Sequence, residues 1–430
     1  MDPVTAAYLT ESIYFTSRLT MSVKTVIVTA PINIALTKYW GKEDEFNIYP
    51  LNNSISLTLS QDQVRPFDHL YFIEKLMTTT KITTGPHLTK SSFSLNGILQ
   101  KEIPSRTKDV IILCLLRARL SNRCPVYRHV YIESTNNFPT AAGLASSASG
   151  MAALAFGLAK LYELDSDITE IARRGSGSSC RSMKGGIVQW IRCPLNETQE
   201  QLTRKSFAKQ LYPCTFWPEL RVAICVTSAA MKPVGSTLAM QRTVHTSSLF
   251  AHGRISSVQI NEEKLLLALK NKDFSSLGTV IMKESNQLHA LCLDAWPPCV
   301  YLNEFSLALI RWVHGINKYF GRLLVAYTFD AGPNCFLIAE AKDMPVLQHL
   351  LVASFGSVGP DTNPAGDDMV TVDADGSRRS LILRGIRYPA SSDPTDSQLL
   401  DSLPRLDGAI SFVISCEIGD GPILVSRSSC

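Results

Sequence analysis

No window of about 20 apolar residues occurs in this 430-residue sequence, although a helix needs that length to cross a bilayer. The first 20 residues also lack a basic segment followed by a continuous apolar core, which is the pattern of a secretory signal. We therefore expect a cytoplasmic protein without a membrane span. Residues 1–22 are expected to form a flexible leader, because strand-like patterning begins only after Met21.

Cysteine pairs at the spacing of a metal site are also absent. The 11 cysteines are scattered and odd in number, and no C-x-x-C pair occurs, so neither a disulfide framework nor a zinc site is indicated. We expect a reducing compartment, no structural metal and no metal-ligating residue. A net charge of +4 is too small to favour nucleic acid as a partner. With 45% hydrophobic and 19% charged residues, the chain is an ordinary globular protein, long enough for two domains.

The two commonest nucleotide-binding motifs, G-x-x-x-x-G-K-[ST] and G-x-G-x-x-G, do not occur either. Residues 136–150 instead place a turn and a run of small residues before an apolar-periodic helix. Small side chains let backbone N–H groups approach an anion, and the helix N-terminus adds unpaired donors and partial positive charge. Ser146 and Ser147 add hydroxyls where a triphosphate would lie. Tight packing alone explains many such segments, so this one does not decide the function by itself.

A second Gly- and Ser-rich segment, residues 173–186, carries three arginines and a lysine. Its hydroxyls and free N–H groups would form a concave donor site, and an arginine fork matches a carboxylate or a phosphate. A flexible surface loop is the alternative interpretation. Two anion sites in one domain favour a phosphorylated substrate that faces a nucleotide.

Asp330 follows an apolar strand, residues 325–329, and precedes the turn Ala331–Asn334. A carboxylate in that position is costly unless it has a partner. It could merely cap the turn. If it is instead a base or an orienting charge at a cleft, a basic partner such as Arg181 is expected nearby.

Residues 38–42, Lys-Tyr-Trp-Gly-Lys, put two cations and two aromatic rings shortly after the first strand. One interpretation is an aromatic pair packed in the core with solvated lysines. The other, which we favour, is a lid over an anionic substrate, in which the lysines act as point charges on phosphate.

The remaining pattern predicts an α+β protein. Residues 194–218 contain three prolines and are expected to form a linker, and the Pro-, Gly-, Ser- and Asp-rich residues 357–408 are expected to be mostly loop. Because no repeating βαβ unit is visible, we expect α+β layers rather than a Rossmann fold. Strands are expected at 24–30, 55–59, 130–133, 186–191, 220–227, 323–329 and 335–340, and helices at 107–120, 143–162, most of 236–289 and 300–320.

Six segments, in order and over nearly the whole chain, resemble mevalonate diphosphate decarboxylase, a family of the galacto-, homoserine, mevalonate and phosphomevalonate kinase superfamily. They are residues 30–35, 38–42, 136–150, 173–186, 284–289 and 327–334. The resemblance implies an ATP- and Mg²⁺-dependent enzyme of isoprenoid and sterol precursor synthesis. Such an enzyme converts mevalonate 5-diphosphate to isopentenyl diphosphate and releases ADP, phosphate and carbon dioxide.

The resemblance also implies an architecture. The superfamily fold has an N-terminal ribosomal-protein-S5-like domain and a C-terminal ferredoxin-like domain, with the site between them. On this chain the two domains are expected at residues 23–193 and 194–430, the second carrying the catalytic aspartate. Family members are commonly homodimers, so a homodimer is expected here.

Carried over to this sequence, the family's site implies four catalytic residues. Asp330 would orient or deprotonate the 3-hydroxyl of the substrate, and Arg181 would hold its carboxylate and balance Asp330. Asn33 would help place the carboxylate and hydroxyl, and Ser147 would bind the ATP phosphates. The other implied ATP-binding residues are Gly143, Leu144, Ala145 and Ser146. The implied substrate-binding residues are Lys38, Tyr39, Trp40, Gly41, Lys42, Arg106, Ser176, Gly177, Ser178, Ser179, Cys180, Arg181 and Ser236.

The sequence departs from the family pattern at a few places. Glu43 stands where the family usually has arginine and Ser179 where it usually has alanine, so the diphosphate subsite is expected to differ in detail. Residues 66–76 look like an insertion. A kinase that stops at the 3-phosphorylated product and a catalytically silent paralogue are the two rival functions. The presence of Asp330 with Arg181, Asn33 and the diphosphate-binding loop argues against the kinase. The presence of Asp330, Ser147 and Arg181 argues against the silent paralogue.

Overall fold

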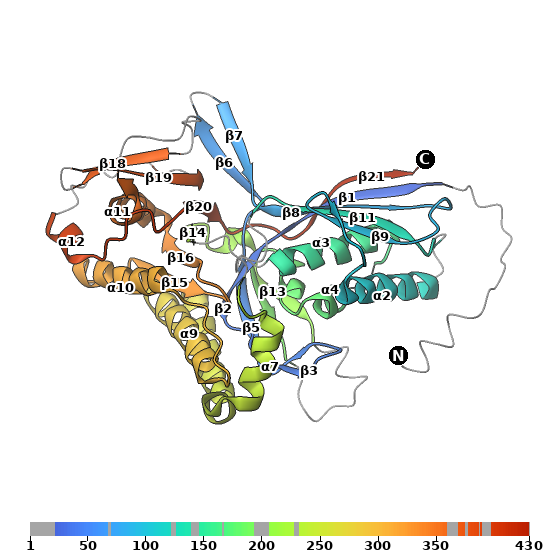
Figure 1. Cartoon of the computed structure of the whole chain (residues 1–430), viewed down its shortest axis with the longest axis horizontal. Helices are drawn as coiled ribbons and strands as arrows, with labels where there is room; N and C mark the ends of the chain where they lie inside the picture. Colours follow the sequence, from blue (N-terminus) through green and yellow to red (C-terminus); the bar gives the residue numbers. More distant parts are fainter. Residues whose placement is uncertain are drawn as a thin grey trace.

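The computed structural model describes residues 22–67, 70–121, 126–138, 146–165, 167–192, 206–227, 232–358, 369–374, 377–386, 388 and 397–429. The expected leader therefore lies outside the described residues except for its last position. Helices and strands mix throughout, in two halves joined side by side (Figure 1). No described helix is both long enough and apolar enough to cross a membrane.

A six-stranded sheet forms the outer part of the first half. Its alternating apolar residues bury one face, as Val26, Val28 and Ala30 do in the first strand. The helices α2 (Ser105–Ser121), α3 (Ser146–Leu161) and α4 (Thr169–Gly175) pack with that face in one apolar core. In spatial order the strands are β10 (Ile98–Leu99), β9 (Ser92–Leu95), β11 (Val130–Asn136), β8 (Met77–Thr84), β1 (Lys24–Pro31) and β21 (Ile423–Ser429).

A second sheet of the first half lies nearer the centre of the molecule. Its order is β13 (Ala208–Tyr212), β12 (Ile187–Trp190), β5 (Ser54–Thr58) and β2 (Asn33–Thr37). All residues of β2 and β5 are buried, and the short helix α5 (Ser179–Ser182) contacts the sheet. Two hairpins, β3 (Lys42–Asp44) with β4 (Tyr49–Pro50) and β6 (Asp62–Phe67) with β7 (Leu70–Lys75), complete this half.

A larger sheet forms the second half. Its order is β15 (Val325–Phe329), β16 (Cys335–Glu340), β14 (Leu220–Val226), β20 (Phe412–Glu417), β19 (Ser377–Gly385) and β17 (Ser357–Val358), with β18 (Met369–Ala374) also paired to β19. The helices α10 (Glu304–Tyr319), α11 (Met344–Phe355) and α12 (Ser397–Ser402) share a core with one face. The helices α8 (Ile255–Asn271) and α9 (Phe274–Asp294) share a core with the other. The π-helical turn η2 (Phe250–Arg254) joins α8 to α7 (Ser236–Thr246).

The two halves share one apolar core. Ile34 of β2 and Leu57 of β5 belong to the same buried cluster as Val222 and Ile224 of β14 and Leu277 of α9. Since this cluster is continuous, the central sheet of the first half is packed onto the second. That packing fixes the end of β2 opposite the end of β15, where the candidate site lies.

Most predicted elements are confirmed, and two regions contain strands that the sequence pattern did not predict. Residues 357–408, expected to be dominated by loops, contain β18, where apolar residues alternate in Val-Thr-Val, and β19, which includes the apolar run Leu-Ile-Leu. The expected linker 194–218 contains β13, which is paired with β12, so residues 208–212 belong to a sheet. In both regions the surrounding Pro, Gly and polar residues obscure short strand patterns.

Candidate active site

A cavity of about 540 Å³ lies between the two halves. It is lined by the end of β2, the start of α3, the loop before α5, the start of α7 and the turn after β15. Most side chains singled out from the sequence meet here. They are Asn33, Lys38, Tyr39, Trp40, Lys42, Arg106, Ser146, Ser147, Ser176, Gly177, Ser178, Arg181, Ser236 and Asp330.

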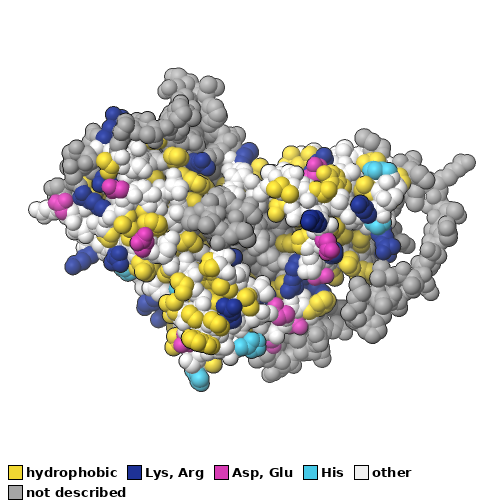
Figure 2. Space-filling model, viewed as in Figure 1, with side chains coloured by type: hydrophobic (Ala, Val, Ile, Leu, Met, Phe, Trp, Pro, Cys, Tyr) yellow, Lys and Arg dark blue, Asp and Glu magenta, His cyan; other side chains and the backbone are white. Residues whose placement is uncertain are grey.

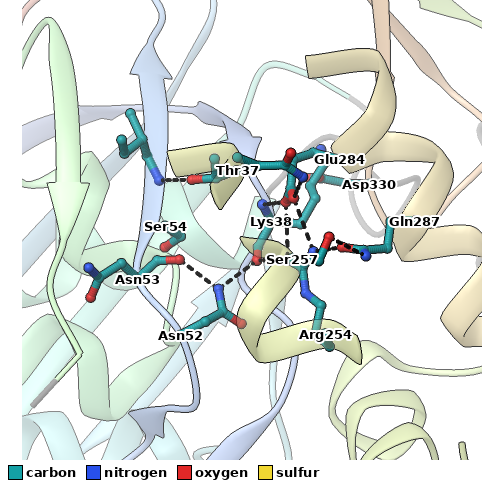
Figure 3. A network of polar contacts seen from close by, with 12 residues as sticks. Thr37, Lys38, Asn52, Asn53, Ser54, Arg254, Ser257, Glu284, Gln287 and Asp330 are labelled. Carbon is teal, nitrogen blue, oxygen red and sulfur yellow. Dashed lines mark hydrogen bonds and ion pairs between the residues drawn. The ribbon is translucent and has the colours of Figure 1, made fainter. Parts of the chain in front are cut away.

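Asp330 forms an ion pair inside this cavity, and its partner is Lys38. The Lys38 Nζ lies 2.7 Å from Asp330 Oδ1, and the side-chain exposures are 2% and 29% (Figure 3). Burial lowers the pKa of Lys38, and the neighbouring Asp330 carboxylate opposes that shift. Arg181 lies near Asp330, as expected: both line the cavity, and the Asp330 charge opposes the effect of burial on the pKa of Arg181. The direct contact with Asp330 is made by Lys38, which was not predicted.

Arg181 is held in place by neutral groups. Its Nη1 donates to Ser54 Oγ at 2.7 Å, and its Nε donates to Asn33 Oδ1 at 3.3 Å. The Asn33 amide in turn donates to Ser182 Oγ at 2.7 Å and to the Ser178 carbonyl at 3.1 Å. Burial lowers the pKa of Arg181. No carboxylate of the described residues forms an ion pair with it, so its charge is available to an anionic ligand.

The two predicted anion-binding segments adjoin each other. Ser176 Oγ lies 3.4 Å from Ser147 Oγ at the start of α3. Beyond Ser178 the loop turns away from the cavity: Ser179 Oγ donates to the Ser176 carbonyl at 2.6 Å, and the Cys180 thiol donates to the Gly177 carbonyl at 3.1 Å. The side chains of Ser179 and Cys180 thus support the loop rather than line the cavity.

The aromatic pair Tyr39–Trp40 is packed, and its flanking lysines are not solvated. Trp40 is 3% exposed and donates to Thr243 Oγ1 at 3.1 Å. The Tyr39 ring packs on Trp190 with 4.6 Å between ring centroids, and its buried hydroxyl has no hydrogen-bond partner among the residues that the structure describes. Lys38 is 1% exposed, so the interpretation with solvated lysines is wrong. Both aromatic residues also line the cavity.

A positively charged rim continues from these rings. Lys42 Nζ lies 2.8 Å from Glu45 Oε2, and Arg106 donates to the Glu45 carbonyl at 2.8 Å. Gly41 does not line the cavity; it occupies a turn with φ of +99°, where a Cβ would lie 2.9 Å from Leu51 Cδ1. Glu43 faces Arg192 at 3.9 Å and is likewise outside the lining.

The start of α3 joins the main cavity to a smaller one. Ser146 and Ser147 line both, and the smaller cavity, of about 240 Å³, is otherwise mostly apolar, with Phe93, Ile132 and Leu154 in its wall. Gly143, Leu144 and Ala145 lie outside the described residues, so their expected place is not seen.

Sequence reasoning missed several groups near the ion pair. Lys232 lines the cavity, and burial lowers its pKa. His289 is buried, and no described residue forms a hydrogen bond with its Nε2. Burial lowers its pKa to about 4, with the Lys38 charge contributing. Glu284 and Arg254 form a fully buried ion pair behind Lys38. The sequence marks residues 284–289 as one of the six family-like segments, but only the fold shows that they lie close to Asp330.

Basic side chains visible outside the cavity are dispersed. Figure 2 shows lysines and arginines scattered over both halves of this face, among acidic and apolar side chains. This face therefore presents no continuous basic patch among its described residues.

Two family models together match most of the chain. The mevalonate 5-diphosphate decarboxylase C-terminal domain matches residues 222–425, and the diphosphomevalonate decarboxylase-like N-terminal domain matches residues 30–200. The chain is 38% identical over 406 residues to diphosphomevalonate decarboxylase of Homo sapiens, covering 92% of each chain. It is 38% identical over 411 residues to that of Saccharomyces cerevisiae, covering 94% of this chain and 96% of the relative.

Solved structures are similar over the same length. Mevalonate diphosphate decarboxylase from Trypanosoma brucei superposes with a TM-score of 0.74 at 29% identity, covering 94% of this chain and 98% of that one. A structure described as MDDEF in complex with MVAPP, AMPPCP and magnesium gives a TM-score of 0.66 at 30% identity, with 94% and 99% covered.

Proposed function

This chain belongs to the mevalonate 5-diphosphate decarboxylase family, and from that premise we propose how its cavity performs the reaction. It is an ATP-dependent enzyme of the mevalonate pathway that decarboxylates mevalonate 5-diphosphate. ATP is the co-substrate and Mg²⁺ the accompanying ion. The observation that carries the assignment of the site is the ion pair between buried Lys38 and partly exposed Asp330 in a cavity lined by hydroxyls and cations.

Asp330 acts on the tertiary 3-hydroxyl of the substrate. It orients this hydroxyl and takes its proton as the oxygen attacks the γ-phosphorus of ATP, which releases ADP. Phosphate then leaves C3, and the electrons of the C1–C2 bond form the C2–C3 double bond as C1 departs as carbon dioxide. Lys38 keeps Asp330 in place and compensates its charge. Lys38 thus binds the Asp330 carboxylate and does not bind the substrate diphosphate.

Arg181 binds the substrate carboxylate. It is buried, it is fixed by Asn33 and Ser54, and it offers a guanidinium that no described carboxylate engages. Asn33 bridges Arg181 and the loop at Ser178, so it sets the place of the carboxylate relative to the hydroxyl. Holding the reacting groups in alignment in this way supplies much of the rate in phosphoryl transfer.

The 5-diphosphate lies along the cationic rim. Lys42 and Arg106 carry charge there, while Ser176, Gly177, Ser178 and Ser236 provide donors. The substrate would replace the Glu45 carboxylate as the partner of Lys42. Tyr39 and Trp40 close the wall, and Gly41, Ser179 and Cys180 shape the backbone behind it.

The start of α3 binds the triphosphate. Ser146 and Ser147 lie at the N-terminus of this 16-residue helix, which favours anions, and Gly143, Leu144 and Ala145 would complete the cradle. The adjoining apolar cavity accommodates the nucleoside.

The residues of the cavity fit Mg²⁺ as a companion of ATP. Mg²⁺ is usually held by one or two carboxylates together with substrate phosphates. The cavity supplies the Asp330 carboxylate and the Ser147 hydroxyl, and no cluster of three metal-ligating side chains exists among the described residues. When bound, the ion neutralises charge on the phosphates.

Three broader proposals follow from family membership. We place the division between the domains at residues 193 and 194, with β13 and β21 returning from the second part of the chain to sheets of the first. We propose that the enzyme is a homodimer. We also propose that it acts in the cytoplasm.

The proposed function is tested by comparing the amount of carbon dioxide released with the amount of ADP formed. Purified protein is incubated with ATP, Mg²⁺ and mevalonate 5-diphosphate labelled at C1, and ADP and labelled carbon dioxide are followed together. Equal release of both is expected. ADP without carbon dioxide would identify a kinase that stops at the 3-phosphate, and release of neither would identify a silent paralogue.

A further inference from the structure

The main chain of Lys38 is held by charged groups on both sides. Its N–H donates to Glu284 Oε2 at 2.9 Å, and its carbonyl accepts from Arg254 Nη2 at 2.7 Å (Figure 3). The same carbonyl accepts from the Asn52 amide at 3.0 Å. Lys38 follows β2 directly, so these bonds replace those that a continued strand would give.

Glu284 and Arg254 form an ion pair that lies outside the lining of the cavity. Both side chains are fully buried, their closest atoms lie 3.1 Å apart, and neither residue lines the cavity. Glu284 Oε1 also accepts from Asn261 at 2.7 Å. Removing two charges from water is expensive, and an apolar pair would fill the same volume at lower cost. Filling the core therefore does not explain why a charged pair lies here, whereas its hydrogen bonds to the Lys38 main chain do.

The next residue of α9 fixes the other end of the site. Ser285 Oγ accepts from the backbone N–H of Phe329 at 2.9 Å, and Phe329 immediately precedes Asp330. Two consecutive residues of one helix thus hold the two strands that supply Lys38 and Asp330. The 2.7 Å contact between Lys38 and Asp330 spans the gap between those strands.

We propose that Glu284 and Ser285 of α9, with Arg254, are positioning residues that set the distance between Lys38 and Asp330. The inference rests on the proposed role of Asp330 in turnover. None of the three lines the cavity; they act through the main chain at residues 38 and 329. Their loss therefore affects the reacting geometry more than substrate binding.

The charge of Glu284 also acts on Lys38. Asp330 and Glu284 favour the protonated Lys38, and burial and Arg181 oppose it. His289, also on α9, and Lys232 lie near the same pair, and Asp330 acts on the pKa of each. Replacing Glu284 by a neutral residue therefore removes a charge from the surroundings of the Lys38–Asp330 pair as well as changing the contact with the Lys38 main chain.

The experiment compares Glu284→Gln and Ser285→Ala with wild type as full-length enzymes. The kcat is expected to fall by about ten- to a hundredfold, as misplacement of reacting groups produces. The KM values for ATP and mevalonate 5-diphosphate stay within about threefold. Arg254→Lys, which keeps the charge, recovers part of the kcat that Arg254→Met loses.

A matched control separates positioning from stability. Asp343 is buried and forms an ion pair with Arg322, and neither residue lines the cavity. Asp343→Asn is expected to lower the Tm without changing kcat or its pH profile. If Glu284→Gln and Ser285→Ala behave like this control, the proposal is overturned. If Glu284→Gln does not fold, the milder Ser285→Ala decides. Carbon dioxide release by wild type tests the proposed function separately, so the two failures are distinguishable.

Discussion

Lys38 and Arg181 line the same cavity, but their surroundings assign them different tasks. Lys38 is already bound to Asp330, whereas Arg181 is surrounded by the neutral partners Asn33 and Ser54. The sequence could predict that Asp330, Arg181 and Lys38 belong to one site, because each lies in a distinctive segment. It could not predict which cation meets the carboxylate, because that depends on how β2 and β15 are packed across the two halves.

Arg181→Gln is expected to lower kcat/KM by on the order of 3 kcal/mol of transition-state stabilisation, because the substrate carboxylate would enter a buried site without its cation. Steady-state kinetics measure this, and the effect should include kcat. Arg117→Gln, which alters a surface pair with Glu170, is the matched control and should have no effect. A change confined to KM would make Arg181 a simple binding residue.

His289 should make the folded protein sensitive to acid. Burial and the Lys38 charge lower its pKa from 6.5 to about 4, so the unfolded chain binds the proton at a higher pH than the folded protein does. The free energy of unfolding should therefore fall as pH decreases from 6.5 to 4, by on the order of 3 kcal/mol for this group. Urea unfolding of wild type and His289→Gln measures the difference. If the free energy of unfolding depends on pH in the same way in both proteins, the lowered pKa of His289 is refuted.

At the scale of elements, the loop before α5 and the segment after β2 form one wall. The Gly177 backbone lies so close to Tyr39 that an added Cβ would be 2.7 Å from Tyr39 Cε1. The glycine- and serine-rich composition predicted an anion-binding loop, and this loop lines the cavity. The composition did not predict that the loop lies close to Tyr39, because this is a long-range contact. Strand β19 was overlooked for a related reason: it also pairs with β17 and β20, which lie elsewhere in the sequence.

Gly177→Ala should displace Tyr39 and distort the proposed diphosphate subsite. The KM for mevalonate 5-diphosphate is expected to rise several-fold, because the side chain that packs on Trp190 must move. The Kd for a non-hydrolysable ATP analogue should stay unchanged. Gly253→Ala is the control, since no described atom lies within 4 Å of its added Cβ. An unchanged KM in Gly177→Ala would place the diphosphate elsewhere.

At the scale of the whole molecule, the end of the chain ties the halves together. After β20 the chain crosses to the first half: the Gly419 N–H donates to the Thr58 carbonyl at 2.9 Å, and the Gly186 N–H donates to the Gly419 carbonyl at 2.8 Å. β21 then pairs with β1 along its length. The sequence pattern could not predict this return or the shared apolar core, since both join residues that lie far apart in the chain.

The halves should therefore unfold together. Scanning calorimetry is expected to give a single transition with equal calorimetric and van't Hoff enthalpies, although multidomain proteins commonly violate two-state behaviour. Cooperative unfolding follows from the continuous core between β2, β5 and β14. Two separated transitions would show that the halves are independent.

The most direct measurement compares wild type with Asp330→Asn for turnover and nucleotide binding in the same preparations. The substitution keeps the shape of the side chain but removes its negative charge and its ability to take the hydroxyl proton. Turnover should fall at least about a hundredfold, as loss of a general base produces, while the Kd for the nucleotide stays within a few-fold. Near wild-type turnover in Asp330→Asn would contradict the account, because the ion pair with Lys38 would then not be the centre of the reaction.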